Sequence, residues 1–170
     1  MPATTTPTGP VACPPRPDDR PPSPDSLAYS VTLPAALSSP ALARAATRAF
    51  LTAHRLGDIL DPALQAVGEL TAAACMFAPG ADIYVSLRQR DGALRVTVHD
   101  GHPVHANRHL AAACDTRRRA ALRLLACVVR ACDGDWGFGA AHAPSGGTRM
   151  WATLPLAGAT AYGAAVPQGE

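Results

Sequence analysis

Lysine is absent from the 170-residue chain, in which all fifteen basic side chains are arginine. Aromatic residues make up 5% and charged residues 16% of the composition. The net charge of +2 gives no general attraction to nucleic acid or to an anionic membrane. No apolar run approaches the ~18 residues of a membrane span, and the first residues lack the pattern of a secretory signal. We therefore expect a cytoplasmic protein with neither membrane nor nucleic acid as a partner.

The five cysteines form no CxxC pair and have no regular spacing. Without an export signal, reduced thiols are the expected state. Cys75, Cys127 and Cys132 lie in apolar helical patterns, so the sequence predicts that they are small core residues.

Proline is concentrated at the N-terminus, where residues 1–26 hold nine of the seventeen prolines. This segment has too few large apolar side chains to offset the entropy of ordering it, so we expect a disordered tail. The small and polar residues 157–170 are expected to form a flexible end for the same reason. Residues 27–156 remain as one compact domain.

Hydrophobic periodicity within the domain predicts an alternation of strands and helices. Asp61-Pro62 is a helix-start pair and Pro79-Gly80 ends that helix. The segments 82–88 and 94–98 alternate strictly around Asp91-Gly92, which predicts a hairpin. The predicted elements are a strand 29–33, helices 40–55 and 61–78, that hairpin, a helix 120–131, and a closing hairpin 136–156. This order predicts an α+β fold, a two-layer sandwich with helices on one face of a mostly antiparallel sheet.

Two carboxylates are candidate site residues. Asp100 shares the strand face of Leu94, Val96 and Val98, so it points toward the core and needs hydrogen-bond donors from the protein or from a ligand. Capping of the following turn is the structural alternative. Glu69 lies in the middle of a helix, on the face away from Val67 and Leu70 in the predicted pattern, and taken alone it is interpreted as a solvated residue.

The order of these elements resembles the histidine-kinase-like ATPase superfamily (the Bergerat fold). The likeness covers roughly residues 30–156 and is greatest to the stand-alone ATP-binding regulators of bacteria, the anti-sigma-factor serine kinases. It rests on Glu69-Leu70 in a helix, a hairpin ending in Asp100, a further helix, Trp136-Gly137, and the run Gly146-Gly147-Thr148-Arg149-Met150-Trp151.

The resemblance implies roles for several residues. Glu69 would be the catalytic base or would position the attacking group. Asp100 would hydrogen-bond the adenine amino group, with Gly101 and Thr148 on the same adenine side of the ATP site. The family's Mg²⁺-binding Asn corresponds to Ala73, whose methyl group cannot ligate a metal that requires oxygen ligands. Mg²⁺ binding is therefore expected to be weak or absent.

The glycine-rich box that holds phosphates in the family is also missing, because no glycine occurs between Gly101 and Gly134. The resemblance places a helix start near Asp115, followed by Arg117, Arg118 and Arg119. Arginine binds phosphate well through its side chain, but cations at a helix N-terminus are disfavoured by about 0.3–1 kcal/mol each. The arginines are accordingly interpreted either as substitute phosphate contacts or as a solvated face.

Histidines suggest a competing site. His99, His102, His105, His109 and Cys114 fall within sixteen residues and carry the ligand atoms that Zn²⁺ prefers. The spacing matches no standard zinc module, and a histidine-bearing variable loop is the alternative. On sequence alone no metal ligand is assigned.

The resemblance implies a regulator of transcription that binds a sigma factor or an anti-anti-sigma protein. Some relatives form homodimers, so a homodimer is possible for this chain in the same way. With its metal and phosphate positions lost, this chain is expected to bind ATP weakly and to act through protein contact, as a pseudokinase. Two alternatives stay open: a competent ATP-dependent serine kinase and a zinc-binding protein.

Overall fold

Two stretches of strict apolar alternation form the centre of the sheet. In β2 (Asp82–Arg90) and β3 (Ala93–Asp100) every second side chain is buried, and the two strands pair antiparallel. The turn between them consists of Asp91 and Gly92, with φ angles of 53° and 72°. Positive φ at both positions is the requirement of a type I′ turn, which an Asp-Gly pair meets at little cost. The predicted hairpin is confirmed.

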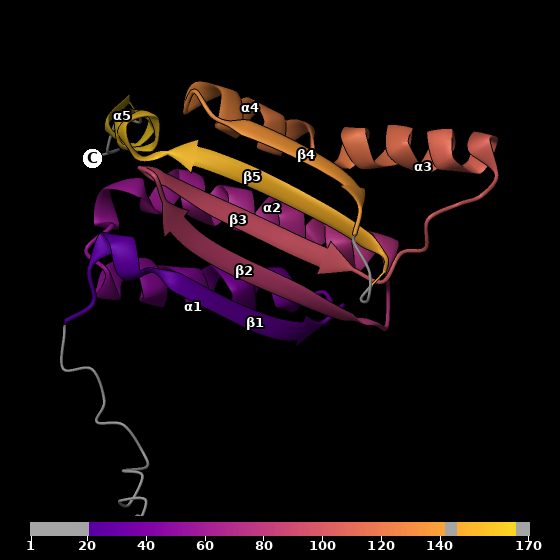
Figure 1. Ribbon diagram of the computed structural model, residues 1–170, viewed down its shortest axis with the longest axis horizontal. Coiled ribbons are helices and arrows are strands. Elements are labelled where there is room, and N and C mark those ends of the chain that lie inside the picture. The colour runs from indigo at the N-terminus through magenta and orange to yellow at the C-terminus, as the bar shows by residue number, and fades with distance from the viewer. Residues whose placement is uncertain (1–20, 142–145, 166–170) are drawn as a thin grey trace, which may run out of the picture.

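The computed structural model describes residues 21–141 and 146–165. Across this part of the chain, a single sheet has the antiparallel order β1-β2-β3-β5-β4 (Figure 1). Strand β1 (Ala28–Pro34) and strand β4 (Asp135–Ala140) are the edges, and β5 (Thr148–Pro155) pairs with both β3 and β4. The predicted first strand and the predicted closing hairpin are therefore both present.

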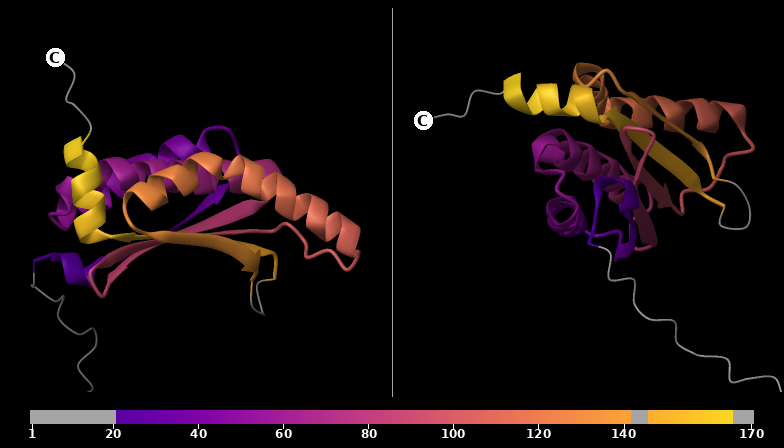
Figure 2. Two further views of the ribbon diagram at one scale, coloured as in Figure 1. Left: turned by 90° about the horizontal axis from the view of Figure 1, so that it is seen from above. Right: turned by 60° about the vertical axis from the view of Figure 1, so that its left-hand side comes forward.

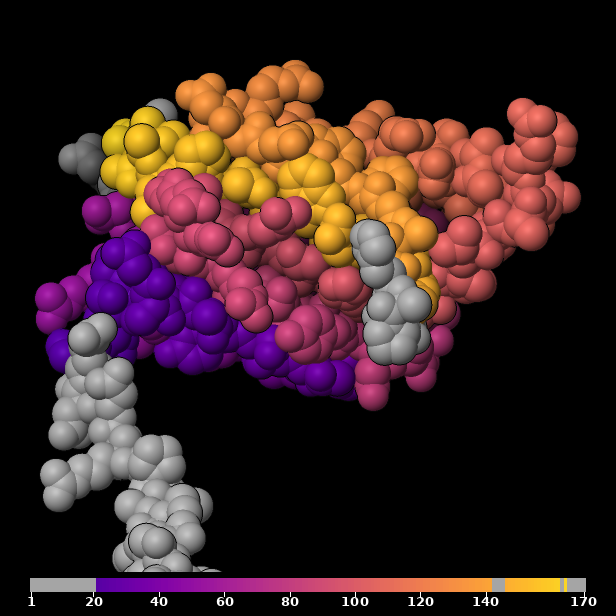
Figure 3. Space-filling view, in the orientation of Figure 1, coloured from indigo at the N-terminus to yellow at the C-terminus, as the bar shows by residue number. Residues whose placement is uncertain are grey.

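Helices form the second layer. Figure 2 shows α1 (Ser39–Ala53), α2 (Leu60–Phe77) and α4 (Arg123–Ala131) on one side of the sheet. The opposite face of the sheet is turned toward the viewer in Figure 1 and in Figure 3, and Figure 1 shows the strands in front of α1 and α2. The chain is thus an α+β protein with the predicted two-layer sandwich.

Helix α2 supplies most of the helical side of the core. Ten of its residues are buried, among them Ala63, Val67, Leu70 and Ala74, and they face buried strand residues such as Val96. The helix follows a 3-10 turn (Gly57–Ile59) and begins at Leu60, one residue before the predicted Asp61. It ends at Phe77, before Pro79-Gly80, as predicted. These contacts make the α2–sheet interface the main hydrophobic core.

Residues 104–133, which contain neither glycine nor proline, include two helices instead of the one predicted for residues 120–131. Helix α3 (Arg108–Ala121) precedes α4, and the buried Leu122 lies at the break between them. Most residues of α3 are exposed, and Figure 1 shows this helix extending beyond the ends of the strands. An exposed helix has little apolar periodicity, which explains why the pattern did not reveal it.

The predicted flexible end from residue 157 is wrong up to residue 165, because residues Leu156–Ala165 form α5. Ala159 is fully buried, and a Cβ atom at Gly158 would lie 2.0 Å from the backbone oxygen of Cys132. Small residues therefore pack here by close backbone approach rather than by large side chains.

At the other end, Pro24–Ser26 form a 3-10 turn and the buried Leu27 begins the core. The remainder of the predicted tails, residues 1–20 and 166–170, lies outside the described residues. Among the helices that the structure describes, none has both the length and the apolar character to cross a membrane.

Candidate functional site

Asp100, the last residue of β3, points into the layer between sheet and helices, as its strand position predicts. It is 4% exposed. It pairs across the sheet with Thr148 of β5, whose hydroxyl donates to the carbonyl oxygen of His102 at 3.3 Å. Gly147 has φ +77°, and a Cβ atom there would lie 2.1 Å from the backbone oxygen of Asp100, so the approach requires glycine. The structure therefore places Asp100, Gly101 and Thr148 next to one another.

A buried ion pair occupies this position. The Nη1 of Arg118 donates to Oδ2 of Asp100 at 2.8 Å, and the two side chains are 3% and 0% exposed. The other carboxylate oxygen accepts the backbone N–H of His102 at 3.0 Å. The guanidinium also lies 4.0 Å from the ring centroid of Phe77 and 3.0 Å from Sδ of Met150. Asp100 thus finds its hydrogen-bond donors within the protein.

Arg118 does not have the exposed, phosphate-binding position that the resemblance implies. It is 2% exposed and its charge faces the carboxylate assigned to adenine. Its Nη2 group has no hydrogen-bond partner among the described residues, so the pair is held at some energetic cost. The prediction for Arg118 is corrected: its guanidinium is buried against the carboxylate of Asp100.

The neighbouring arginines also differ from expectation. Helix α3 begins at Arg108 rather than near Asp115, and the Asn107 side chain caps it by accepting two backbone N–H groups. Arg117 and Arg119 are exposed near its C-terminal end. Cations are favoured at that end of a helix. The predicted strain of arginines at a helix start is therefore absent, and so is the helix start that was to hold phosphate.

Glu69 is separated from the Asp100 region. It is half-buried and lines a hollow of about 460 Å³ together with Arg44 and Tyr162. It precedes Phe77, which touches Arg118, by eight residues of α2, a rise of about 12 Å along the helix. The Mg²⁺ position of the resemblance, Ala73, is 2% exposed. Within the part of the chain that the structure describes, Glu69 therefore lines a different hollow from the one beside Arg118 and Thr148.

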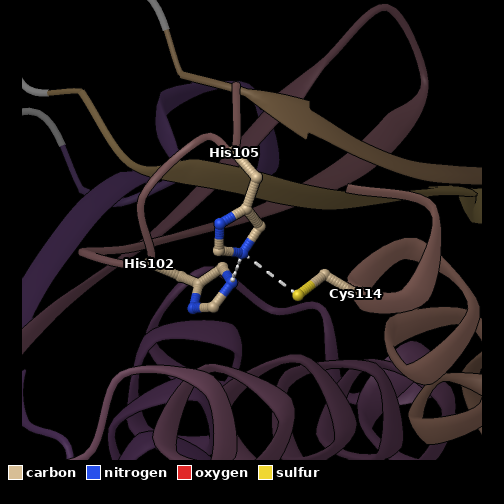
Figure 4. A group of neighbouring side chains, drawn as sticks. All are labelled: His102, His105 and Cys114. Carbon is tan, nitrogen blue, oxygen red and sulfur yellow. Dashed lines mark hydrogen bonds between the residues drawn. The ribbon is translucent and has the colours of Figure 1, made fainter. Parts of the chain in front are cut away.

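Three of the five residues considered as zinc ligands in the sequence converge, although the sequence alone assigned none of them to a metal. Nε2 of His102 lies 3.2 Å from Nε2 of His105, which lies 3.1 Å from Sγ of Cys114 (Figure 4). The three ligand atoms lie within 4.8 Å of one another, and each side chain is half-buried. The two histidines come from the segment after β3 and the cysteine from α3. We call these three residues the HHC cluster.

The other two candidate residues, His99 and His109, lie elsewhere. His99 is on the opposite face of β3 from Asp100, paired with Arg149 and beside the ring of Tyr84. Burial, with the charge of Arg149, lowers the pKa of His99 from its usual 6.5, and Asp100 partly opposes this effect. His109 is exposed in the first turn of α3. The opposite directions of His99 and Asp100 follow from the alternation of side chains along a strand.

The predicted core cysteines differ in their burial. Cys132 is buried, Cys75 is half-buried and Cys127 is exposed on α4. Burial is the main cause that raises the pKa of both Cys75 and Cys132. The prediction for Cys127 is wrong because α4 has a narrow apolar stripe that points elsewhere.

Two features of this site have no sequence signal. The wall formed by Phe77 and Met150 is built from α2 and β5, and ordinary core periodicity predicts both residues equally well as packing. The pairing of Arg118 with Asp100 joins residues from α3 and β3. Which of the three adjacent arginines reaches Asp100 depends on how α3 is rotated about its own axis. The spacing His102-x-x-His105 was the visible part of the HHC cluster, and the fold brings Cys114 to it.

Comparison with known proteins adds no assignment. No protein-family model matches the sequence, and no curated protein matches it at a significant level. The geometry of the Asp100–Arg118 pair and of the HHC cluster therefore provides the basis for a functional proposal.

Proposed function

We propose that the chain is a cytoplasmic regulator resembling the anti-sigma-factor serine kinases, in which an internal arginine occupies the nucleotide position. In this proposal it acts through contact with a protein partner, a sigma factor or an anti-anti-sigma protein, rather than by phosphoryl transfer. The two-layer sandwich and the inward Asp100 support the likeness in fold. The Asp100–Arg118 pair supports the loss of nucleotide binding.

The ion pair is the observation that carries this proposal. An adenine amino group needs the same carboxylate that accepts the Arg118 guanidinium at 2.8 Å. Removing one partner from a buried pair costs about 3–5 kcal/mol. Such a cost corresponds to a loss of nucleotide affinity of about a hundredfold to a few thousandfold. ATP would therefore bind weakly, even with an otherwise suitable pocket.

The catalytic groups give further support. Phosphoryl transfer requires metal ions and cations around the γ-phosphate. The buried Ala73 offers no metal ligand, and Glu69 lines a separate hollow from the Asp100 neighbourhood. A kinase of the resembled type would need these groups around one nucleotide.

An apolar surface supports a protein partner. A hollow of about 590 Å³ is lined largely by apolar side chains from the segment that leads into α1 and from the end of α2. Leu37 is fully exposed at its rim and Met76 is 60% exposed. Contiguous exposed apolar groups are typical of protein interaction sites. We propose this hollow as the contact for the partner, or for a second copy of the chain.

Thermal-shift titration with ATP and ADP, with and without Mg²⁺, tests whether Arg118 prevents nucleotide from binding at Asp100. A ligand at one hundred times its Kd adds about 2.7 kcal/mol of stability, a shift on the order of 5–15 °C for a domain of this size. We expect no such shift for the wild type at millimolar nucleotide. Arg118→Ala, which frees Asp100, should gain a nucleotide-dependent shift, whereas Arg130→Ala, at an exposed arginine of α4, should not.

A Mg²⁺-enhanced shift in the wild type would instead favour the competent kinase. Absence of a shift in a cooperatively melting Arg118→Ala variant would contradict the idea that the arginine replaces a nucleotide.

The partner proposal is tested by binding of purified sigma factors and anti-anti-sigma proteins from the same genome. We expect Leu37→Asp to abolish binding and Leu124→Asp, at an exposed leucine of α4, to leave it unchanged. Equal loss in both variants, or binding to none of these proteins, would contradict the proposed contact.

A further inference from the structure

The HHC cluster lies beside the buried ion pair, where its residues line one cavity with Arg118 and Thr148, and it is separate from the proposed partner surface. We propose that His102, His105 and Cys114 form a zinc-binding site that holds α3 to the segment following β3. This proposal does not depend on the proposed function, because the cluster has the same ligand atoms whether or not nucleotide binds.

The separations of the ligand atoms suit a tetrahedral ion. With Zn–N bonds of about 2.0–2.1 Å and a Zn–S bond of about 2.3 Å, tetrahedral geometry puts two nitrogens about 3.4 Å apart and a nitrogen and a sulfur about 3.6 Å apart. The two Nε2 atoms of His102 and His105 are 3.2 Å apart, and Nε2 of His105 is 3.1 Å from Sγ of Cys114. All three ligand atoms lie within 4.8 Å of one another, so a shift of Sγ would bring them to the separations of a single tetrahedral ion.

A hydrogen bond on the far side of the His102 ring orients this imidazole for metal binding. Nδ1 of His102 lies 3.1 Å from the carbonyl oxygen of Phe77. A carbonyl oxygen only accepts, so Nδ1 carries the proton and donates it, and Nε2 presents its lone pair to the cluster. Metal-binding histidines are characteristically oriented in this way by an outer hydrogen bond. The ring of Phe77 also packs against that of His102, with centroids 5.5 Å apart.

The donor set selects the class of ion. Two imidazoles and one thiolate favour Zn²⁺ over Mg²⁺ or Ca²⁺, which take oxygen ligands. The three residues also line a cavity of about 90 Å³, and a water molecule occupies about 30 Å³ in the liquid. The cavity therefore has room for an ion with one water as the fourth ligand.

The placement of the ligands indicates what the ion does. His102 and His105 lie in the segment between β3 and α3, and Cys114 lies in the second turn of α3. Helix α3 extends beyond the sheet (Figure 1) and has one buried residue, Arg118. A metal bound by all three residues would therefore fix a helix that otherwise has few apolar contacts.

Calorimetric titration of the reduced, chelator-treated full-length protein with ZnCl₂ tests the site directly. We expect one equivalent to bind and the melting temperature to rise with it. Cys114→Ser and His105→Ala should each weaken binding at least tenfold, since even residues outside the first layer of ligands change affinity by about 10–100-fold. Cys127→Ser on α4 and His109→Asn on α3 are matched controls outside the cluster and should bind as the wild type does.

Titration with Co²⁺ distinguishes this site from surface binding. The wild type should develop the visible bands of tetrahedral cobalt and a thiolate-to-cobalt charge-transfer band, and Cys114→Ser should lose the latter. The three side chains are only half-buried, so replacing one of them removes little packing. The metal-free variants should therefore melt at the same temperature as the metal-free wild type. Failure of the wild type to bind Zn²⁺ at 100 micromolar, on the order of a very weak site, would overturn the proposal. Equal binding by Cys114→Ser and the wild type would also overturn it.

Discussion

Among single residues, Asp100 shows most clearly how burial selects a partner. Its carboxylate lies where the strand alternation predicts, yet its charge is met by Arg118 from a helix eighteen positions later in the chain. A buried carboxylate without such a cation would be strongly destabilising. The pair is therefore a structural requirement of this core.

A double-mutant cycle measures that requirement. Arg118→Met leaves Asp100 buried without its cation and should lower the free energy of unfolding by about 3–5 kcal/mol. Asp100→Asn in the same chain should restore much of the loss, because the buried charge is then removed. Urea denaturation provides both values. Additive effects of the two substitutions would show that the groups do not interact.

His99 predicts a pH dependence. Burial lowers its pKa from the usual 6.5, so below pH 6.5 the unfolded chain takes up a proton that the folded chain resists. The free energy of unfolding should then fall as the pH decreases below 6.5, with no contribution from His99 above that value. Urea denaturation between pH 5.5 and 7.5 should show a smaller decrease for His99→Asn than for the wild type. An identical decrease in both would exclude His99 as its source.

Among the helices, α3 and α5 depart most from the sequence pattern, for opposite reasons. Helix α3 begins at a capping Asn107 and has mostly exposed side chains. Helix α5 consists of small residues and is held by backbone contact at Gly158 and by the buried Ala159. Neither helix has the broad apolar stripe from which a helix is predicted.

Substitution of Gly158 tests the packing of α5. A methyl group at this position would meet the backbone oxygen of Cys132 at 2.0 Å, and backbone atoms cannot move aside easily. Gly158→Ala should lower the melting temperature by several degrees, although alanine favours helix over glycine by about 1 kcal/mol. Gly57→Ala is the control, since a Cβ atom there has no neighbour within 4 Å among the described residues. A stabilised Gly158→Ala variant would mean that α5 is loosely docked.

For the whole molecule, the order of the strands concentrates stability in the middle of the sheet. Strand β3 is paired on both sides, by β2 and β5, and its inward side chains Leu94, Val96 and Val98 are fully buried against the helical layer. Helix α3 projects from the end of this layer (Figure 1). The molecule therefore combines a firm centre with a peripheral helix that contains Cys114 and Arg118.

Amide hydrogen exchange should reveal this gradient. Amides of β3 should exchange most slowly, at rates set by global unfolding, whereas those in the first two turns of α3 should exchange through local opening. Mass spectrometry of peptides from both segments, in metal-free buffer, provides the comparison. Equal protection of α3 and β3 would show that α3 is part of the same cooperative unit.

The sequence by itself predicts the layers of this protein. Backbone geometry fixes the direction of neighbouring side chains, so local alternation predicts the 82–98 hairpin and the inward direction of Asp100. Tertiary structure decides which groups meet there. Whether Arg117, Arg118 or Arg119 reaches Asp100 depends on how α3 is rotated about its own axis. Whether Cys114 meets the two histidines depends on the path of the chain between β3 and α3. Such contacts join distant positions, and no local periodicity records them.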